Sequence, residues 1–275
     1  MIRDFTPTSS MLINYCSLPF CFGKTRRLRR LEILKQKTRH IAGETTLDGT
    51  RWTYPDPVSF AYGYQAIIGK RIYKFRSPKK NPTIIDCGAN VGIASVYWKK
   101  AYPDAQITAI EADPSVYSYL LENLNRSGCK GIHSINKAVW HKDGVARFTP
   151  NNADGGGLSD CLASAHQRPA TIEVETISLA SIINRSPVDL LKIDIEGAEA
   201  ELLINQAECL QHVQRIFVEY HSFVDKPQQL HRLLSVLAES GFRLHIHSEL
   251  TSRRPFSTMY RDGDMDNRLN IFAWR

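Results

Sequence analysis

The sequence has little that would hold a metal or build a disulfide framework. Its 275 residues include six cysteines, which are scattered, with no C-x-x-C pair and no cysteine–histidine spacing of the zinc type. The pattern therefore predicts no metal site, and a reduced, cytoplasmic setting is the simplest interpretation. The cysteines are Cys16, Cys21, Cys87, Cys129, Cys161 and Cys209.

Long apolar runs are also missing. Residues 11–22 are apolar, but this run is only about a dozen residues long, contains Pro19 and precedes its basic cluster, so it fits neither a spanning helix nor a secretory signal. We expect it to be a buried N-terminal segment. The composition, 43% hydrophobic and 23% charged, is that of an ordinary globular protein. It predicts one large domain over residues 81–275, preceded by an N-terminal extension over residues 1–80.

The net charge of +7 is concentrated near the N-terminus, where residues 24–39 form a basic run. Leu28, Leu31 and Leu34 recur through this run at helical spacing, which predicts a helix that packs its leucines on the body and exposes its charges. Contact with an anionic membrane surface is the alternative. Nucleic acid is disfavoured as a partner, because the run lacks interleaved aromatic residues for base stacking.

The dinucleotide spacing G-x-G-x-x-G is absent from the most informative stretch, residues 83–95, because Asn90 stands where the second glycine is required. Instead, an apolar run ends in Asp86, a tight turn follows, and Gly92 opens a helix. Gly88 permits backbone torsions that a side chain would forbid, and Gly92 lets the helix start lie close to a ligand. Asp86 suits a sulfonium cation with a free amino group better than a pyrophosphate. We therefore expect S-adenosylmethionine as the ligand.

The second half of the predicted site lies one strand later. Residues 106–110 are typical of a buried strand, which ends at Glu111, and Pro114 suits the first turn of a helix that runs to about Ser127. In an open parallel sheet, an acidic residue about 20 positions beyond the glycine turn typically accepts hydrogen bonds from ribose hydroxyls. Glu111 is therefore the predicted ribose ligand. In the alternative interpretation Glu111 and Asp113 only cap the helix, although Asp113 alone would serve as a cap.

The order of strands and helices predicts an α/β fold. Asp48 and Gly49 indicate the turn of a hairpin over residues 46–54, and residues 55–59 are expected to form a loop. Residues 61–75, whose secondary structure the sequence leaves ambiguous, are expected to cover one side of the cofactor cleft. From Thr83 onward strands alternate with helices, which predicts a mostly parallel sheet with helices on both faces. Further strands are expected at residues 133–139, 146–149, 171–176, 188–193, 215–220, 242–247 and 270–274.

Charged side chains follow two of these later strands. One strand is followed by Asp194 and Glu196, and the next brings Glu219 and His221 to the same edge of the sheet. Glu219 and His221 share one face of their strand because side chains alternate with a period of two. Lys192, inside the first of these strands, is unexpected because a buried ammonium is costly unless it is paired. We expect a carboxylate partner for it.

Four stretches together resemble the FkbM family of S-adenosylmethionine-dependent methyltransferases: residues 84–92, 110–114, 191–199 and 218–221, of which 194–199 (D-I-E-G-A-E) is the most specific. The resemblance covers about residues 46–275. It implies the class I methyltransferase (Rossmann-like) fold, with a seven-stranded sheet that contains one antiparallel strand, and O-methylation of a hydroxyl group on a sugar or secondary metabolite. The cofactor-binding positions that it implies are Asp86, Gly88, Ala89, Asn90, Gly92 and Glu111, with Asn136 and Ala138 near the adenine.

Methyl transfer from a sulfonium to an alcohol needs a base near the acceptor oxygen. His221 is the first candidate because its ordinary pKa is the most suitable, with Glu219 or Asp194 to orient it and Asp194 as the second candidate. A histidine that only bridges strand and loop is an equally open interpretation. Carboxylates also suit magnesium, with Asp194, Glu196 and Glu219 as oxygen ligands, although nothing in the spacing requires a metal.

Two alternatives to an O-methyltransferase stay open. RNA- and nitrogen-directed methyltransferases resemble one another in an Asn/Asp-Pro-Pro-aromatic motif at the end of the fourth strand, where this chain has residues 194–197. A catalytically silent cofactor-binding protein that docks through the basic run is the alternative from another class. The acidic and imidazole groups at the strand ends argue against it, since a scaffold gains nothing from burying them.

The longest irregular segment is predicted to begin at residue 151 and to extend to residue 167. Three consecutive glycines, residues 155–157, indicate mobility, and long loops in compact domains are often lids or binding loops. We therefore expect this glycine segment to close over the methyl acceptor, and a solvated connector is the alternative.

Overall fold

A computed structural model of the protein describes residues 19–151, 156–159, 161, 171–249, 254, 256–258 and 264–275, with side chains from residue 25 onward. Its centre is a seven-stranded sheet, whose strands in chain order are β3 (Thr83–Cys87), β4 (Gln106–Glu111), β5 (Ile132–Asn136), β10 (Leu190–Ile193), β11 (Arg215–Phe223), β12 (Arg243–Ser248) and β13 (Met265–Trp274). In space their order is β12-β13-β11-β10-β3-β4-β5. Strand β13 is antiparallel to both of its neighbours and the other pairings are parallel, which confirms the predicted sheet.

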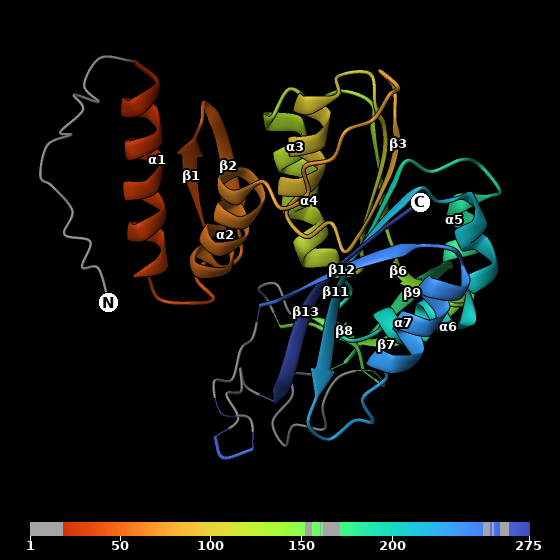
Figure 1. The fold of residues 1–275 in the computed structure, drawn as a ribbon. Coiled ribbons are helices and arrows are strands. Elements are labelled where there is room, and N and C mark those ends of the chain that lie inside the picture. The colour runs from red at the N-terminus through yellow and green to blue at the C-terminus, as the bar shows by residue number, and fades with distance from the viewer. Residues whose placement is uncertain are drawn as a thin grey trace, which may run out of the picture.

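Helices cover both faces of this sheet (Figure 1). Two of them, α3 (Ile93–Ala101) and α4 (Pro114–Arg126), lie together on one face. The other face carries α5 (Leu179–Ile183), α6 (Glu199–Asn205), the 3-10 helix η2 (Ala207–His212) and α7 (Leu230–Glu239), whose buried side chains share one apolar cluster with the strands. The buried leucines of α6 and α7 pack with β10 and β11 in one apolar cluster. Helix α4 has its predicted bounds because Pro114 opens it and the Asp113 side chain accepts the Ser115 N–H at 2.8 Å.

A second sheet holds three of the predicted segments. It consists of β6 (Ala138–Trp140), β7 (Gly144–Thr149), β8 (Gly157–Leu158) and β9 (Ile172–Ser178), in the order β6-β9-β7-β8. The sequence predicts strands in these three segments but does not indicate that they form a second sheet. Parallel neighbours need a long crossover connection, whereas only a short turn joins β6 to β7. The predicted strand over residues 133–139 is divided between the two sheets, β5 and β6, on either side of Lys137.

The N-terminal extension contains α1 (Pro19–Lys35), β1 (Gly43–Leu47), β2 (Thr50–Tyr54), α2 (Pro57–Tyr64) and a π-helix, η1 (Gln65–Lys70). Its hairpin turns at Asp48 and Gly49, which both have positive φ, as the sequence predicts. The prediction of a loop over residues 55–59 is wrong, because α2 begins at Pro57. Asp56 instead caps α2 by accepting the Ser59 N–H at 2.9 Å, and Pro57 begins the helix.

The basic run forms α1, and its leucines divide between core and solvent. Leu31 and Leu34 are buried in a cluster that includes Trp52 of β2 and Leu120 of α4, so the extension shares a core with the sheet domain. Leu28 is 41% exposed, and its predicted burial is wrong. Residues three apart drift by about 60° around a helix, so three such leucines do not all face one neighbour. The segment of residues 11–22 lies outside the described side chains, and no helix in the described part of the chain is both long and apolar enough to cross a membrane.

Candidate functional site

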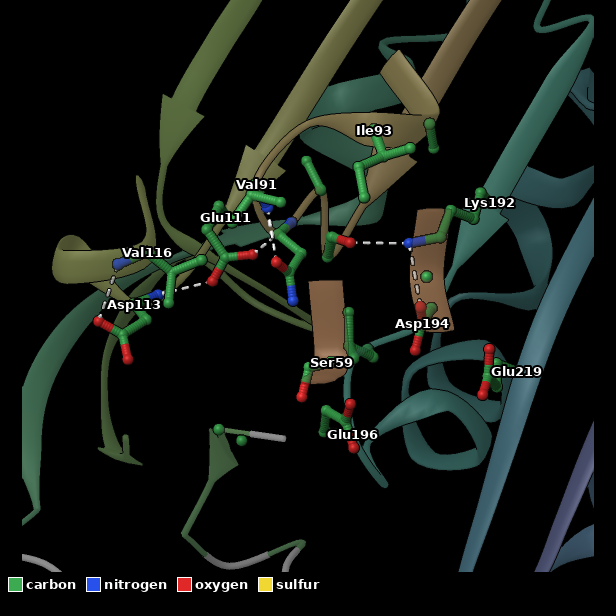
Figure 2. Close-up of a pocket in the computed structure, with 18 of the residues that line it drawn as sticks. Ser59, Val91, Ile93, Glu111, Asp113, Val116, Lys192, Asp194, Glu196 and Glu219 are labelled. Atoms are coloured by element: carbon green, nitrogen blue, oxygen red, sulfur yellow. Dashed lines mark hydrogen bonds and ion pairs between the residues drawn. The ribbon is translucent and has the colours of Figure 1, made fainter. Parts of the chain in front are cut away.

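A cavity of about 760 Å³ lies at the carboxyl ends of β3, β4, β10 and β11. This volume falls within the usual range of small-molecule sites. Glu111 and Asp113 line one end, and Lys192, Asp194 and Glu219 line the other (Figure 2). Open α/β sheets bind their ligands at this edge.

The turn after β3 forms the wall between these two ends. Gly88, Ala89 and Asn90 all line the cavity, and the N–H groups of Gly88 and Ala89 both donate to the Ile110 carbonyl at 2.9 Å. Asn90 has a φ of 50°, and its Oδ1 atom accepts the Val91 N–H at 2.6 Å. Asparagine tolerates the left-handed region for this reason, which explains why it replaces the second glycine of the dinucleotide pattern.

The two glycines of the turn are required by packing within the protein. Gly88 has a φ of 76°, and a Cβ atom there would lie 1.8 Å from the Asp194 carbonyl oxygen. Gly92 is not among the described residues that line the cavity, and a Cβ atom there would lie 2.7 Å from Cδ1 of Leu120 on α4. The expectation that Gly92 makes room for a ligand is therefore not supported. This glycine lets α3 begin against α4.

Asp86 lies in the protein interior behind the cavity wall, where it contacts Ser95 and Lys192. Its side chain is fully buried, accepts the Ser95 hydroxyl at 2.6 Å and forms an ion pair with Lys192 at 3.3 Å. Burial raises the pKa of Asp86, and the Lys192 ammonium opposes this effect. Because the side chain has no exposed surface, the structure does not place it against a ligand as the sequence predicts. It places Asp86 against Lys192.

Glu111 has the environment expected of a ribose ligand. Its Oε2 atom accepts the Asn90 N–H at 2.8 Å, and its Oε1 atom accepts the Asp113 N–H at 2.9 Å. Burial raises the pKa of Glu111 to about 7, although these two N–H donors oppose the shift. Each carboxylate oxygen keeps another lone pair for a hydroxyl donor in the cavity. The capping role of the alternative interpretation belongs to Asp113.

The two residues predicted to lie near the adenine have different positions. Ala138 lines the cavity, as expected. Asn136 is absent from the described part of the wall, and its Nδ2 atom donates to the carbonyls of Glu111 at 2.9 Å and of Ala112 at 3.2 Å. Asn136 thus braces the segment that follows β4.

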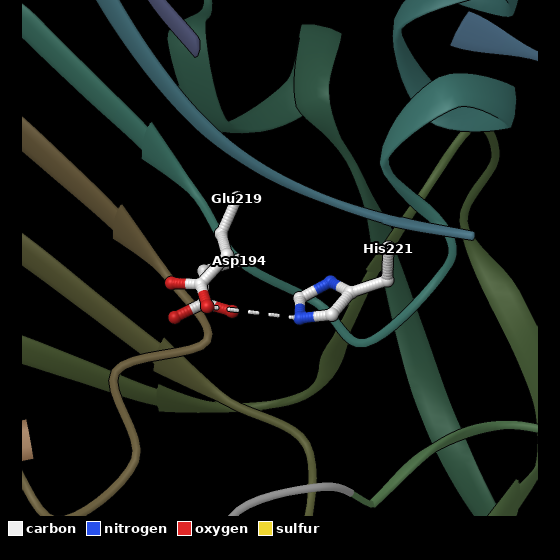
Figure 3. A group of neighbouring side chains, drawn as sticks. All are labelled: Asp194, Glu219 and His221. Carbon is white, nitrogen blue, oxygen red and sulfur yellow. Dashed lines mark ion pairs between the residues drawn. The ribbon is translucent and has the colours of Figure 1, made fainter. Parts of the chain in front are cut away.

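At the other end of the cavity, the structure brings Asp194, Glu219 and His221 together as predicted (Figure 3). One polar atom from each of the three side chains lies within 4.8 Å of the other two. Burial and the neighbouring Asp194 carboxylate raise the pKa of Glu219 to about 7, while His221 and Arg268 oppose the shift. Glu219 is therefore a carboxylate that titrates near neutral pH.

His221 does not have the ordinary pKa on which its predicted role depends. Its Nδ1 atom lies 3.0 Å from Oε1 of Glu199, and its Nε2 atom lies 3.7 Å from Glu196 and 3.9 Å from Glu219. Burial alone would lower the pKa of His221, but these three carboxylates raise it well above the usual value. The expectation of a histidine that titrates near neutrality is wrong. At neutral pH the imidazolium has no free nitrogen to accept a proton.

Glu199 explains the D-I-E-G-A-E pattern. It is fully buried, and besides contacting His221 its Oε1 atom accepts the N–H groups of Ile195 at 3.1 Å and Gly197 at 3.0 Å. Glu196 and Gly197 have positive φ of 55° and 99°, so the carboxylate stabilises a strained turn after β10. Sequence reasoning includes Glu199 in the most specific motif but assigns it no role of its own.

The Asp194, Glu219 and His221 side chains are also the described group whose spacing best suits a metal ion. This group differs from the carboxylate trio considered from sequence, because His221 replaces Glu196. Lys192 lies 3.2 Å from Asp194, and Arg268 lies 3.7 Å from Glu219. With the protonated His221, these cations already offset the carboxylates, so the cluster does not need a metal for charge balance.

The N-terminal extension forms part of the wall, as predicted for residues 61–75, of which Tyr62, Gln65 and Lys70 line the cavity. Sequence reasoning missed Arg39, Asp56 and Ser59 of the same extension and Asn270 of strand β13. Asn270 pairs with Glu219 across the sheet and donates to Glu249 at 2.8 Å. These four residues carry no sequence signal, because they reach the cavity only through tertiary packing.

The glycine segment differs from the predicted lid. Gly157 pairs with Thr149 in β8, and a Cβ atom at Gly156 would lie 3.0 Å from Phe148. Both glycines line the cavity, and Gly157 belongs to the small sheet, so the prediction of an irregular loop is wrong for Gly157. Gly155 and residues 162–167 lie outside the described residues.

The strand order, with β13 as the antiparallel strand, and the site at the carboxyl edge define the class I, Rossmann-like methyltransferase architecture. The family model for the methyltransferase FkbM domain matches residues 86–244, more than half of the chain, and the chain belongs to this family.

Curated relatives include several proteins named as methyltransferases. Methyltransferase sdnD of Sordaria araneosa is 27% identical over 171 residues, which cover 51% of this chain and 66% of that protein. The 2-O-methyltransferase NoeI of Sinorhizobium fredii is 26% identical, with coverages of 52% and 64%. The hexuronic acid methyltransferase AglP of Haloferax volcanii is 25% identical, with coverages of 57% and 63%. Each match spans less than two thirds of the relative's own length.

The solved structure of methyltransferase FkbM from Methylobacillus flagellatus aligns with a TM-score of 0.47 and 12% identity, over 91% of this chain and 60% of that one.

Proposed function

We propose that this protein is an S-adenosylmethionine-dependent methyltransferase that acts on a hydroxyl group of a sugar or secondary metabolite. Family membership supports methyl transfer. The names of two relatives, a 2-O-methyltransferase and a hexuronic acid methyltransferase, support an oxygen acceptor and a sugar-acid acceptor respectively. The observation that carries the proposal is the Glu111 carboxylate, fixed by two backbone N–H groups beside the turn of Gly88 and Asn90.

The residues at the Glu111 end of the cavity fit the cofactor. Glu111 would accept the ribose hydroxyls, the Gly88–Ala89–Asn90 turn would lie against the nucleoside, and Ala138 would contact the adenine. S-adenosylmethionine, when bound, supplies a methyl group on a sulfonium. The opposite end of the cavity, lined by Asp194 and Glu219, then remains for the methyl acceptor and is called the acceptor end.

Glu219 is the residue best suited to remove the acceptor's proton. Its pKa of about 7 is close to the value at which a general base is most effective at neutral pH. The His221 imidazolium, 3.9 Å from Oε1 of Glu219, favours the ionised carboxylate. Asp194 is held by Lys192 at 3.2 Å, which leaves it better placed to orient the acceptor than to take its proton. In this proposal the base role passes from His221 to Glu219.

A transfer assay with a labelled methyl group tests the proposal. Purified protein would be incubated with labelled S-adenosylmethionine and separate panels of sugars, sugar acids, hydroxylated secondary metabolites, amines and RNA. We expect a one-methylene mass gain on a hydroxyl compound. Labelling confined to RNA or to an amine would support the nitrogen-directed alternative. Cofactor binding without turnover on any panel would support a silent cofactor-binding protein.

A further inference from the structure

Lys192 makes several polar contacts at the cavity. It lies on β10, its side chain is 3% exposed, and it reaches the cavity wall. Its Nζ atom donates to the Gly88 carbonyl at 2.7 Å and forms an ion pair with Asp194 at 3.2 Å (Figure 2). The same atom forms an ion pair with Asp86 at 3.3 Å and donates to the Cys87 carbonyl at 3.4 Å. An ammonium has three N–H donors, and these four neighbouring oxygen atoms outnumber them, so the cation is surrounded by partners within the protein.

These contacts join two parts of the cavity that belong to different strands. Gly88 begins the turn after β3, which leads to Asn90 and, through its N–H, to Glu111. Asp194 follows β10 at the acceptor end. A single buried cation therefore fixes the cofactor turn relative to an acceptor-side carboxylate. Both carboxylates raise the pKa of Lys192 well above its usual value, against the effect of burial, so the cation persists at neutral pH.

A comparison within the same two strands separates this arrangement from an ordinary strand-to-strand tie. At the other ends of β3 and β10, Lys79 forms an ion pair with Asp189 at 3.0 Å, and Asp189 also accepts the Thr83 N–H at 2.9 Å. The Lys79 side chain is 47% exposed and needs little desolvation. Burying Lys192 is far more costly. Pairing between the strands does not require that cost, because the Lys79–Asp189 pair and four backbone register positions already hold them together.

We propose that Lys192 is a positioning residue, which orients the Gly88 turn and Asp194 so that the cofactor and the acceptor meet at a fixed separation. This inference rests on the proposed function. It predicts that loss of the ammonium weakens cofactor binding, although the ammonium is assigned no part in the chemical step.

Calorimetry with S-adenosylmethionine and with its demethylated product would test this role in four variants. Lys192→Met keeps the length and removes the charge, Lys192→Arg keeps the charge, and Lys192→Gln keeps one donor for the Gly88 carbonyl. Lys79→Met is the matched control. We expect Lys192→Met to weaken binding by at least about tenfold, Lys192→Gln by a smaller factor, and Lys192→Arg by less than about threefold. Lys79→Met should bind like the natural protein.

The outcomes separate this inference from the proposed function. If the natural protein binds neither ligand, the proposed function is wrong. If the natural protein binds and Lys192→Met binds equally well, the positioning role is wrong. If Lys192→Met and Lys192→Arg weaken cofactor binding equally, the loss comes from altered packing and not from the missing charge. That result would also show that the positioning role is wrong. Should Lys192→Met fail to fold, as circular dichroism would reveal, the comparison of Lys192→Gln with Lys192→Arg decides in the same way.

Discussion

The Nδ1 atom of His221 lies 3.0 Å from the Oε1 atom of Glu199, a carboxylate with no exposed surface. The same carboxylate oxygen accepts N–H groups from the turn after β10. The protonation of the histidine and the shape of the turn are thus linked through one side chain. Because of this link, His221 is a permanent cation at the end of the cavity that holds Asp194 and Glu219. Glu219 is therefore the candidate base.

Replacing Glu219 by glutamine tests the base directly. An amide cannot accept the proton of the acceptor hydroxyl, so turnover should fall by about 10² to 10⁴. Cofactor affinity should change little, and steady-state kinetics together with calorimetry would show both effects. In the natural protein the rate should rise with pH as Glu219 loses its proton near its pKa of about 7, and then level off. A rate that does not change through neutral pH would exclude this carboxylate.

Cofactor binding should depend on the ionisation of Glu111. Glu111→Gln removes charge-assisted acceptors for the ribose hydroxyls, and affinity should fall at least about tenfold. In the natural protein, affinity should decrease as pH falls below about 7, because protonation replaces an acceptor lone pair with a hydrogen. Calorimetry across pH measures this trend. The control is Glu122→Gln, on the exposed side of α4, where the carboxylate pairs with Arg126; equal loss in both variants would remove the ribose assignment.

Alanine substitutions at two glycines with nearly equal φ can distinguish the cost of backbone strain from the cost of a steric clash. Gly49 has a φ of 78°, and a Cβ atom added there would have no neighbouring atom within 4 Å. At Gly88, with a φ of 76°, an added Cβ atom would lie 1.8 Å from the Asp194 carbonyl oxygen. Gly49→Ala should lose about 1–2 kcal/mol of unfolding free energy from strain alone. Gly88→Ala should lose about 1–3 kcal/mol more. Urea denaturation measures both, and equal losses would mean that the turn after β10 moves aside at little cost.

Chelation tests the cluster of Asp194, Glu219 and His221. We expect EDTA to leave turnover unchanged, because Lys192, Arg268 and the protonated histidine already offset these carboxylates. Assays before and after dialysis against the chelator would measure this. Loss of activity that magnesium or manganese restores would contradict the expectation, and would assign the three side chains as metal ligands.

The pKa of His221 should respond to Glu199. Removing one of three neighbouring carboxylates in Glu199→Gln should lower the pKa of the imidazole, which an NMR titration of the ring would record. Glu201→Gln is the control, because Glu201 is exposed on the same helix and faces His141 instead. An imidazole that titrates identically in both variants would show that Glu199 does not hold its proton.

The sequence predicts those features that depend on neighbours along the chain. The turn from Gly88 to Asn90, the cap at Asp113 and the hairpin at Gly49 each follow from local backbone preferences. The meeting of Asp194 with His221 follows from parallel strands ending at one edge. Such rules require only residue order and periodicity.

The remaining features depend on contacts between distant segments. The protonation of His221 needs Glu196 and Glu199, which reach it only after the turn beyond β10 has folded. Position 92 requires glycine because a Cβ atom there would clash with Leu120, which lies on another helix. The second sheet arises from short connections that leave β6, β7 and β9 outside the central sheet, although the sequence pattern indicates a strand for each.

The position of β13 between β11 and β12 has a consequence for synthesis on the ribosome. Strand β12 is made before β13, yet in the described sheet it hydrogen-bonds only to β13. Until residues 265–274 have left the exit tunnel, β11 therefore has a bare edge and β12 has no place to dock. Exposed edges of this kind invite pairing with other chains. Completion of this sheet must then wait for translation of β13, and slow translation of the connecting segment would lengthen the period in which nascent chains can aggregate.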